Sequence, residues 1–141
     1  MNYKVKYEQW LNSESIDKED REELLSIKDN EKEIDERFYT DLAFGTGGMR
    51  GIRGIGTNRM NKYMIRKATQ GLANYMLKVD ADRARKEGVA IAYDCRIGST
   101  EYALNTALVL AANGIKAYLF ESLRSTPELS FAVRETGALA G

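Results

Sequence analysis

Glycine and arginine are concentrated in one short segment whose chemistry is that of anion binding. Residues 45–56 read Gly-Thr-Gly-Gly-Met-Arg-Gly-Ile-Arg-Gly-Ile-Gly, with six glycines among twelve residues. Glycine lets backbone N–H groups approach a ligand closely, and consecutive N–H groups in such a turn form a concave anion site. Thr46 adds a hydroxyl, and the guanidinium groups of Arg50 and Arg53 can each pair with two phosphate oxygens. The segment predicts a phosphate or sugar-phosphate site, with a flexible connecting loop as the alternative.

Two further loops carry polar side chains. Asp94 and Arg96 follow a predicted strand, at the edge where open α/β sheets bind ligands. The residue types favour another interpretation, in which these two side chains form a local ion pair and Ser99 caps the next helix. In the third loop, Thr126 is interpreted first as the helix cap before Pro127 and only second as a ligand.

The glycine segment does not fit the common nucleotide-binding templates. No Gly-Lys-Ser/Thr completes a P-loop, and in a GxGxxG alignment the third position is Arg50. A nucleotide-binding domain is therefore the weakest of the functions considered.

Composition excludes several classes of site. The 141 residues include no His and one Cys, so a His base, a catalytic triad, a His metal site and a disulfide framework are all excluded. Cys95 is expected to be a plain buried thiol. The net charge of zero argues against a nucleic-acid partner. No apolar run reaches the ~18 residues of a membrane span and no secretory signal is recognisable, so we expect a cytoplasmic protein without a membrane partner.

Residues 1–38 are predicted to form a helical N-terminal arm. They lack Gly and Pro and suggest a helix around residues 3–11, a second one capped by Ser15 or Asp17, and a last turn over 31–37. The acidic residues of that last turn are interpreted as a solvated face rather than a cation site.

Beyond the arm, helical and strand patterns alternate. We expect a short strand at 41–44 and a polar connection at 80–88. A further strand, the third of the sheet, is expected after Gly137. The sequence stops there, and we interpret this stop as truncation. Strand, helix, strand and helix at this spacing indicate a βαβ unit with parallel strands. The main predicted elements are a helix at 62–79 capped by Asn61, a strand at 89–93, a helix at 99–113, a strand at 115–120 and a helix opening at 126. The first of these helices is expected to pack through Met64, Ala68, Leu72, Tyr75, Met76 and Val79.

The order of these motifs resembles that of a known enzyme family. Phe44–Gly51 is similar to the Gly-Thr-Ser/Ala/Gly-Gly-x-Arg loop in the first domain of α-D-phosphohexomutases, the phosphoglucomutase/phosphomannomutase family. The strand that leads into residues 93–96 and the Ser-Thr-Pro-Glu turn at 125–128 follow in the family's order. The arm, ending in residues 36–38, resembles the longer bacterial phosphoglucomutase branch.

The resemblance implies a fold and a domain division. We expect an α/β fold, a three-layer α/β/α sandwich with a mixed, partly parallel sheet, preceded by the helical arm. The expected division is residues 1–38 for the arm and 39–141 for the first domain. That domain would be incomplete, since the family's Thr-Ala-Ser-His-Asn-Pro loop with its nucleophilic serine would follow Gly141.

The resemblance also implies a reaction. Family members interconvert hexose 1-phosphate and hexose 6-phosphate through a phosphoserine and a bisphosphate intermediate, here glucose 1,6-bisphosphate if the sugar is glucose. Mg²⁺ would be held by residues outside this sequence, and the partners would be the hexose phosphate and the remaining domains. The 141 residues alone are predicted to be inactive, and sugar specificity would lie in loops outside them. The alternative is a non-catalytic phosphosugar-binding α/β module.

Roles for individual residues follow from the same resemblance. Arg50 matches the family's active-site arginine, which faces the phosphoserine and the substrate phosphate. The expected phosphate-binding set is Thr46, Gly47, Gly48, Arg50 and Arg53, with Asp94 and Arg96 in a supporting role and no metal ligand.

Overall fold

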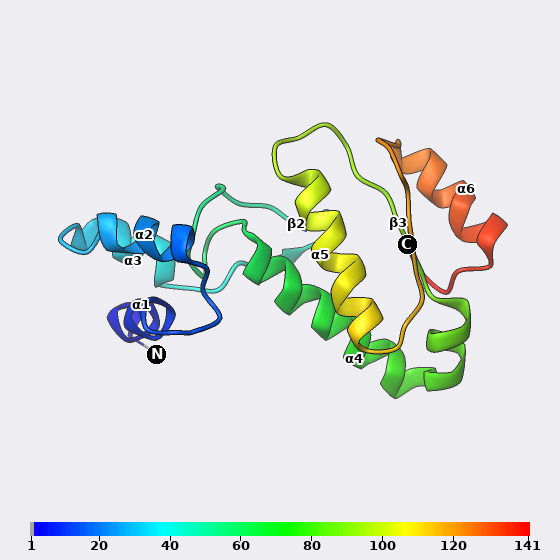
Figure 1. Cartoon of the computed structure of the whole chain (residues 1–141), viewed down its shortest axis with the longest axis horizontal. Coiled ribbons are helices and arrows are strands. Elements are labelled where there is room, and N and C mark those ends of the chain that lie inside the picture. The colour runs from blue at the N-terminus through cyan, green and yellow to red at the C-terminus, as the bar shows by residue number, and fades with distance from the viewer. Residues whose placement is uncertain (1) are drawn as a thin grey trace. The chain divides into compact units, whose positions relative to one another are not determined.

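The computed structural model describes residues 2–141, which form a mixed α/β structure with two compact units (Figure 1). The first unit ends at Met64 and the second comprises Ile65–Gly141. In chain order the elements are α1 (Tyr3–Leu11), α2 (Lys18–Ser26), α3 (Glu31–Phe38), β1 (Phe44–Gly45), β2 (Gly48–Met49), α4 (Lys62–Glu87), β3 (Val89–Ile91), α5 (Ser99–Ala112), β4 (Ala117–Leu119) and α6 (Thr126–Thr136).

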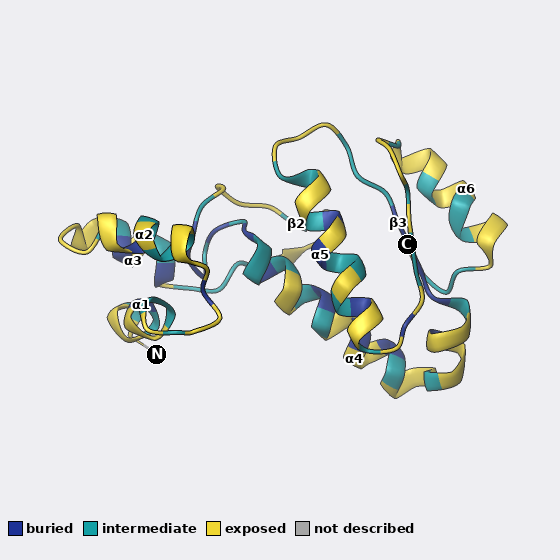
Figure 2. Cartoon of the chain, viewed as in Figure 1, coloured by how far each residue is buried: buried dark blue, intermediate teal, exposed yellow. Residues whose placement is uncertain are grey.

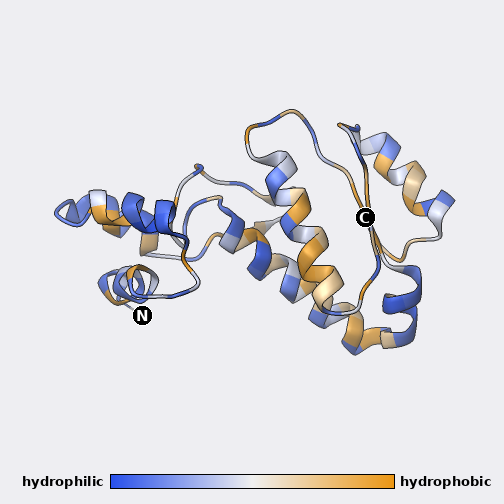
Figure 3. Ribbon diagram, in the orientation of Figure 1, coloured by the Kyte–Doolittle hydropathy of each residue, from blue (hydrophilic) through white to orange (hydrophobic). Residues whose placement is uncertain are grey.

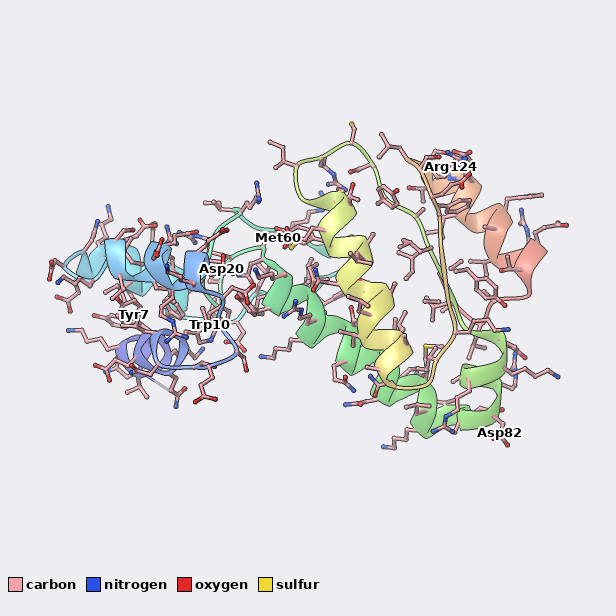
Figure 4. All side chains as sticks on the ribbon, in the orientation of Figure 1. Tyr7, Trp10, Asp20, Met60, Asp82 and Arg124 are labelled. Atoms are coloured by element: carbon pink, nitrogen blue, oxygen red, sulfur yellow. The ribbon has the colours of Figure 1, made fainter. Side chains whose placement is uncertain are left out.

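The first unit has its own core between the three arm helices. Residues 31–37, expected as a last helical turn, belong to a full helix, α3, which the Asn30 side chain caps by accepting a hydrogen bond from the Glu33 N–H. Phe38 is fully buried, and the rings of Tyr7 and Trp10 (both labelled in Figure 4) each meet it edge-on, with ring centroids 5.7 Å apart. The buried cluster comprises Tyr7, Ile16, Leu24, Ile34, Phe38 and Ile55.

The strand expected at 41–44 is shorter and lies later in the chain. Only Phe44–Gly45 is a strand, and it pairs antiparallel with β2 in a separate hairpin. The preceding residues are held differently, because the Leu42 N–H donates to the Thr57 carbonyl at 2.7 Å.

Helix α4 is longer than the sequence predicts. Asn61 caps it as expected, since its Oδ1 accepts from the Met64 N–H at 2.9 Å. The prediction of a polar connection over 80–88 is wrong. Asp80 is the one non-helical position inside α4, and its side chain accepts from the Arg83 N–H at 3.0 Å, so it acts as a second N-cap from which the helix continues to Glu87.

The packing face of α4 also differs from the predicted one. Met64 and Met76 are buried as expected, but Leu72, Tyr75 and Val79 are exposed. Ala73 takes the core position instead of Leu72. It belongs to the cluster that forms the core of the second unit, which comprises Ala73, Met76, Ala84, Val89, Ile91, Ala103, Leu110 and Ile115. Figure 2 shows buried stretches along α4 and β3, and Figure 3 shows the apolar character of α5.

The predicted parallel strand pair is confirmed. Val89, Ala90 and Ile91 pair in register with Ala117, Tyr118 and Leu119. Helices α5 and α6 lie on opposite sides of the pair (Figure 1). The segment after Gly137 continues beside β3, because Ala140 forms a parallel bridge with Val89 and its carbonyl accepts from the Ala90 N–H at 2.9 Å. An extended segment is therefore present where the sequence predicts a third strand.

The N-cap of α6 differs from the predicted one. Ser125, not Thr126, is the N-cap, because its side chain and backbone N–H both bond to Glu128 in a capping box. Gly137 ends the helix in the left-handed conformation that glycine favours.

Candidate functional site

The glycine–arginine segment begins as a tight hairpin. Phe44 pairs with Met49 and Gly45 with Gly48, which leaves Thr46 and Gly47 at the turn. Gly48 has a φ of 91°, a conformation that favours glycine and lets the second strand return beside the first. Thr46 and Gly47 are exposed, so the turn presents its polar groups to solvent.

Arg50 lies directly after this hairpin and folds back over it. A Cβ placed on Gly47 would lie only 3.0 Å from Nη2 of Arg50, so the absence of a side chain at Gly47 makes room for the guanidinium. Arg50 is exposed, and across residues 2–141 it forms no ion pair and no side-chain hydrogen bond. Its five N–H donors are therefore available to a ligand.

Arg53 has a fixed backbone and an available side chain. On its two sides, the Met60 N–H donates to the Ile52 carbonyl at 2.8 Å and the Gly54 N–H to the Met60 carbonyl at 3.2 Å (Met60 is labelled in Figure 4). The Arg53 side chain is exposed and has no ion-pair or hydrogen-bond partner in the described part of the chain.

Asn61 organises the residues that follow, which sequence reasoning did not anticipate beyond the helix cap. Its Nδ2 donates to the carbonyls of Gly54, Gly56 and Arg59, at 2.9, 2.9 and 3.1 Å. Because Asn61 is buried, these bonds satisfy backbone groups that water does not reach freely. We call residues 54–61 the loop base and residues 44–53 the loop tip.

Two other arginines connect the loop base with α2 and α3. Of their contacts, only the i,i+4 pair of Arg37 with Glu33 follows a sequence pattern. Arg37 forms ion pairs with Glu23 and, at 2.8 Å, with Glu33. Its hydrogen bond lowers the pKa of Glu33 below the ordinary value. Arg59 is buried and donates to the Glu36 carbonyl at 3.3 Å.

The second unit holds the other two predicted site residues. Asp94 pairs with the Nε of Arg96 at 2.7 Å, which is the local ion pair that the sequence favours. The Ser99 hydroxyl donates to Asp94 at 2.8 Å instead of capping α5, and the residue at the cap position is Gly98. The Ser99 hydroxyl and the Arg96 N–H lower the pKa of Asp94. Cys95, expected to be buried, is exposed because it lies in this surface turn.

A pocket of about 300 Å³ lies at the carboxyl end of β3 in the second unit. Asp94 and Arg96 line it, together with Arg124, which sequence reasoning left without a role. Arg124 (labelled in Figure 4) donates to the Ser122 hydroxyl and the Leu123 carbonyl. The polar side chains around the pocket are those of Tyr93, Asp94, Arg96, Ser99, Tyr102, Thr106, Arg124 and Thr126.

Residues 2–141 contain no cluster of metal ligands. No group of three or more His, Cys, Asp or Glu side chains in that range could hold a metal ion. Three acidic residues of α3 pair with basic side chains: Glu31 with Lys4, Glu33 with Arg37 and Glu36 with Arg59. None of the described helices combines the length and apolar character needed to cross a bilayer.

Comparison with known proteins assigns the family. Residues 41–141 match phosphoglucomutase/phosphomannomutase, alpha/beta/alpha domain I. The chain is 42% identical over 104 residues to a phosphoglucomutase of Staphylococcus haemolyticus, an alignment that covers 74% of the chain and 18% of that protein. It is 43% identical over 110 residues to the phosphoglucomutase of Staphylococcus epidermidis (78% and 19% covered) and 41% identical over 115 residues to that of Staphylococcus aureus (80% and 20%).

The chain thus belongs to the phosphoglucomutase/phosphomannomutase family and matches its domain I. It spans about a fifth of the length of these curated relatives. No solved structure gives a significant match.

Proposed function

We propose that this chain is the first domain of a phosphohexomutase that interconverts hexose 1-phosphate and hexose 6-phosphate, with glucose as the foremost sugar. Support comes from the match to domain I and from relatives named phosphoglucomutase. In this proposal residues 39–141 belong to a three-layer α/β/α sandwich and residues 1–38 form the arm. A phosphoserine and glucose 1,6-bisphosphate carry the phosphoryl group between the two positions of the sugar.

The observation that carries the proposal is the unpaired guanidinium of Arg50 over the exposed hairpin. Arg50 donates two parallel hydrogen bonds to phosphate oxygens, while Thr46 and the N–H groups of Gly47 and Gly48 bind others. Arg53 supplies a second positive charge. Phosphoryl transfer depends mainly on positioning and charge stabilisation, which is the chemistry that this set of donors provides.

Other parts of the enzyme supply the rest of the reaction. The motif Ser-His-Asn-Pro, which carries the nucleophile in the family, does not occur in these 141 residues, so we expect them to show no turnover alone. Mg²⁺ would spread the charge of the transferred group, but the donors present in residues 2–141 do not fit a metal site. Asp94 and Arg96 have a supporting role at the pocket beside β3.

Titration of the isotope-labelled chain with inorganic phosphate and with glucose 1-phosphate tests the binding step by NMR. We expect shifts of the backbone amides of residues 46–48 and about tenfold weaker binding in Arg50→Ala, since a charge-assisted hydrogen bond contributes roughly 1.5–3 kcal/mol. Arg83→Ala is the matched control, because Arg83 pairs with Glu87 in an exposed position on α4.

Equal affinity of Arg50→Ala and the natural chain would contradict the proposed site. Phosphate binding at the hairpin, together with no mutase turnover by the complete protein, would favour the non-catalytic phosphosugar-binding module.

A further inference from the structure

An ion pair between two arm residues holds the glycine–arginine segment, residues 45–56, which carries Arg50 and Arg53. We propose that Glu23 of α2 and Arg37 of α3 are positioning residues for the phosphate-binding loop tip. This inference rests on the proposed function, but it concerns a part of the chain outside the family match, which begins at residue 41.

The first step is the contact between the ion pair and Ile55 in the loop base. Glu23 Oε1 accepts from the Ile55 N–H at 3.2 Å, and Arg37 Nη1 donates to the Ile55 carbonyl at 3.1 Å. Arg37 Nη1 also donates to Glu23 Oε1, so the ion pair binds both backbone polar groups of one loop residue. The Arg37 side chain is 14% exposed, which limits competition from water.

The second step is the close approach of the loop base to the end of α3. A Cβ placed on Gly56 would lie 2.7 Å from the Arg37 carbonyl oxygen, and the φ of Gly56 is 142°. That carbonyl accepts from the Asn58 N–H at 2.9 Å, and the Glu36 carbonyl accepts from the Asn58 side chain at 3.0 Å. The last carbonyls of a helix lack hydrogen-bond donors within the helix, and here Asn58 of the loop base supplies those donors.

The third step connects these contacts to the loop tip. The two backbone segments that flank the tip are both attached to the arm or to the loop base. On one side Thr57 donates to the Thr40 carbonyl at 2.6 Å and accepts from the Leu42 N–H at 2.7 Å. On the other side Arg53 directly precedes Gly54, whose carbonyl is bound by Asn61. The loop base, which the arm holds at Ile55 and Gly56, therefore sets where the tip, with its two free guanidinium groups, begins and ends.

A positioning role predicts a measurable effect at a distance from the ion pair. Glu23→Gln keeps the shape of the side chain and removes its charge, so the chain should stay folded while the hold on Ile55 weakens. We expect about tenfold faster amide hydrogen exchange over residues 44–58 and about tenfold weaker binding of inorganic phosphate. Exchange in α5 should not change.

Matched variants separate positioning from general destabilisation. Glu87→Gln breaks an Arg–Glu pair of similar chemistry at the exposed end of α4 and should alter neither readout. Arg37→Lys keeps the charge but loses the planar fork whose Nε bonds Glu33 and so aims Nη1 at Glu23 and Ile55; it should therefore reproduce the effect of Glu23→Gln.

The outcomes for the two proposals are distinguishable. Unchanged exchange over residues 44–58 in Glu23→Gln, or faster exchange with natural phosphate affinity, would overturn the positioning role. Failure of the natural chain to bind phosphate, or equal binding by Arg50→Ala, would instead overturn the proposed function. In that case the exchange experiment would still decide whether the arm holds the tip.

Discussion

The base and the tip of the glycine–arginine loop use the same kinds of residue and differ in what their polar groups bind. In the base, Arg59 is buried against the end of α3, and Asn61 bonds three carbonyls and caps α4. In the tip, Arg50 and Arg53 are exposed, and neither has a side-chain partner within the described residues. An arginine with a structural role has its partners within the fold, whereas an arginine with a free fork is available to a ligand.

The difference between the loop base and the loop tip also indicates how the site would bind a ligand. Binding groups are most effective when the backbone that supports them is rigid, because less conformational entropy is then lost when the ligand binds. The base supplies this rigidity through buried hydrogen bonds and ion pairs, and the tip supplies the donors. Substitutions in the tip should change function at constant stability, and substitutions in the base should change stability first.

The largest expected effect is that of Arg50→Ala in the complete enzyme that we propose. Losing one charge-stabilising donor should lower kcat/KM by about 10²-fold or more. The free energy of unfolding should stay within about 0.5 kcal/mol, because the side chain has no protein partner. Steady-state kinetics and urea denaturation measure the two quantities, and near-normal turnover would contradict the assignment of Arg50.

Asn61→Ala should show the opposite pattern. It leaves the carbonyls of Gly54, Gly56 and Arg59 without their donor and removes the cap of α4, so we expect a loss of about 3 kcal/mol in unfolding free energy. Urea denaturation of the 141-residue chain measures this loss. Asn74→Ala, at an exposed position of α4, is the control. A loss no larger than that of the control would show that the base does not depend on Asn61.

A pH titration of stability should test the ion pair by which Arg37, the arm residue that binds the base, is itself held on α3. The pKa of Glu33 lies below its ordinary value of 4.5 in the folded chain, because Arg37 donates a hydrogen bond to it. The stabilisation is therefore complete above the unfolded pKa and is lost as pH falls through the lower folded pKa. We expect unfolding free energy to decline below about pH 4.5, and to decline less in Glu33→Gln. The same slope in both chains would exclude Glu33 as a source of the decline.

Arg53→Ala should have the smallest effect on the fold. The hydrogen bonds of Met60 hold the backbone on both sides of Arg53, and the Arg53 side chain has no partner in residues 2–141. We therefore expect the free energy of unfolding to change by no more than about 0.5 kcal/mol. Thermal unfolding measures the change. A loss above 1 kcal/mol, by the same measurement, would place Arg53 with the base arginines and weaken the distinction between the two regions.

Much of the fold could be predicted from local patterns. The strand predicted from residue 89 and the helix predicted to end at residue 113 led to the correct parallel pair, because an apolar run and a helix end are local properties. The packing face of α4 could not be predicted in the same way. Periodicity gives the spacing of a face, but contact with the rest of the core selected Ala73 and left Leu72 and Tyr75 exposed.

By itself the sequence determined where the glycines and arginines lie and which residue caps α4, since Asn61 bonds a backbone N–H only three residues along the chain. It did not determine which arginines are free. Arg37 meets a carboxylate 14 positions earlier and Arg59 a carbonyl 23 positions earlier. Only the tertiary structure decided those pairings, because partners so far apart along the chain are brought together by packing of the arm core and not by local geometry. The availability of Arg50 and Arg53 is therefore a consequence of the fold.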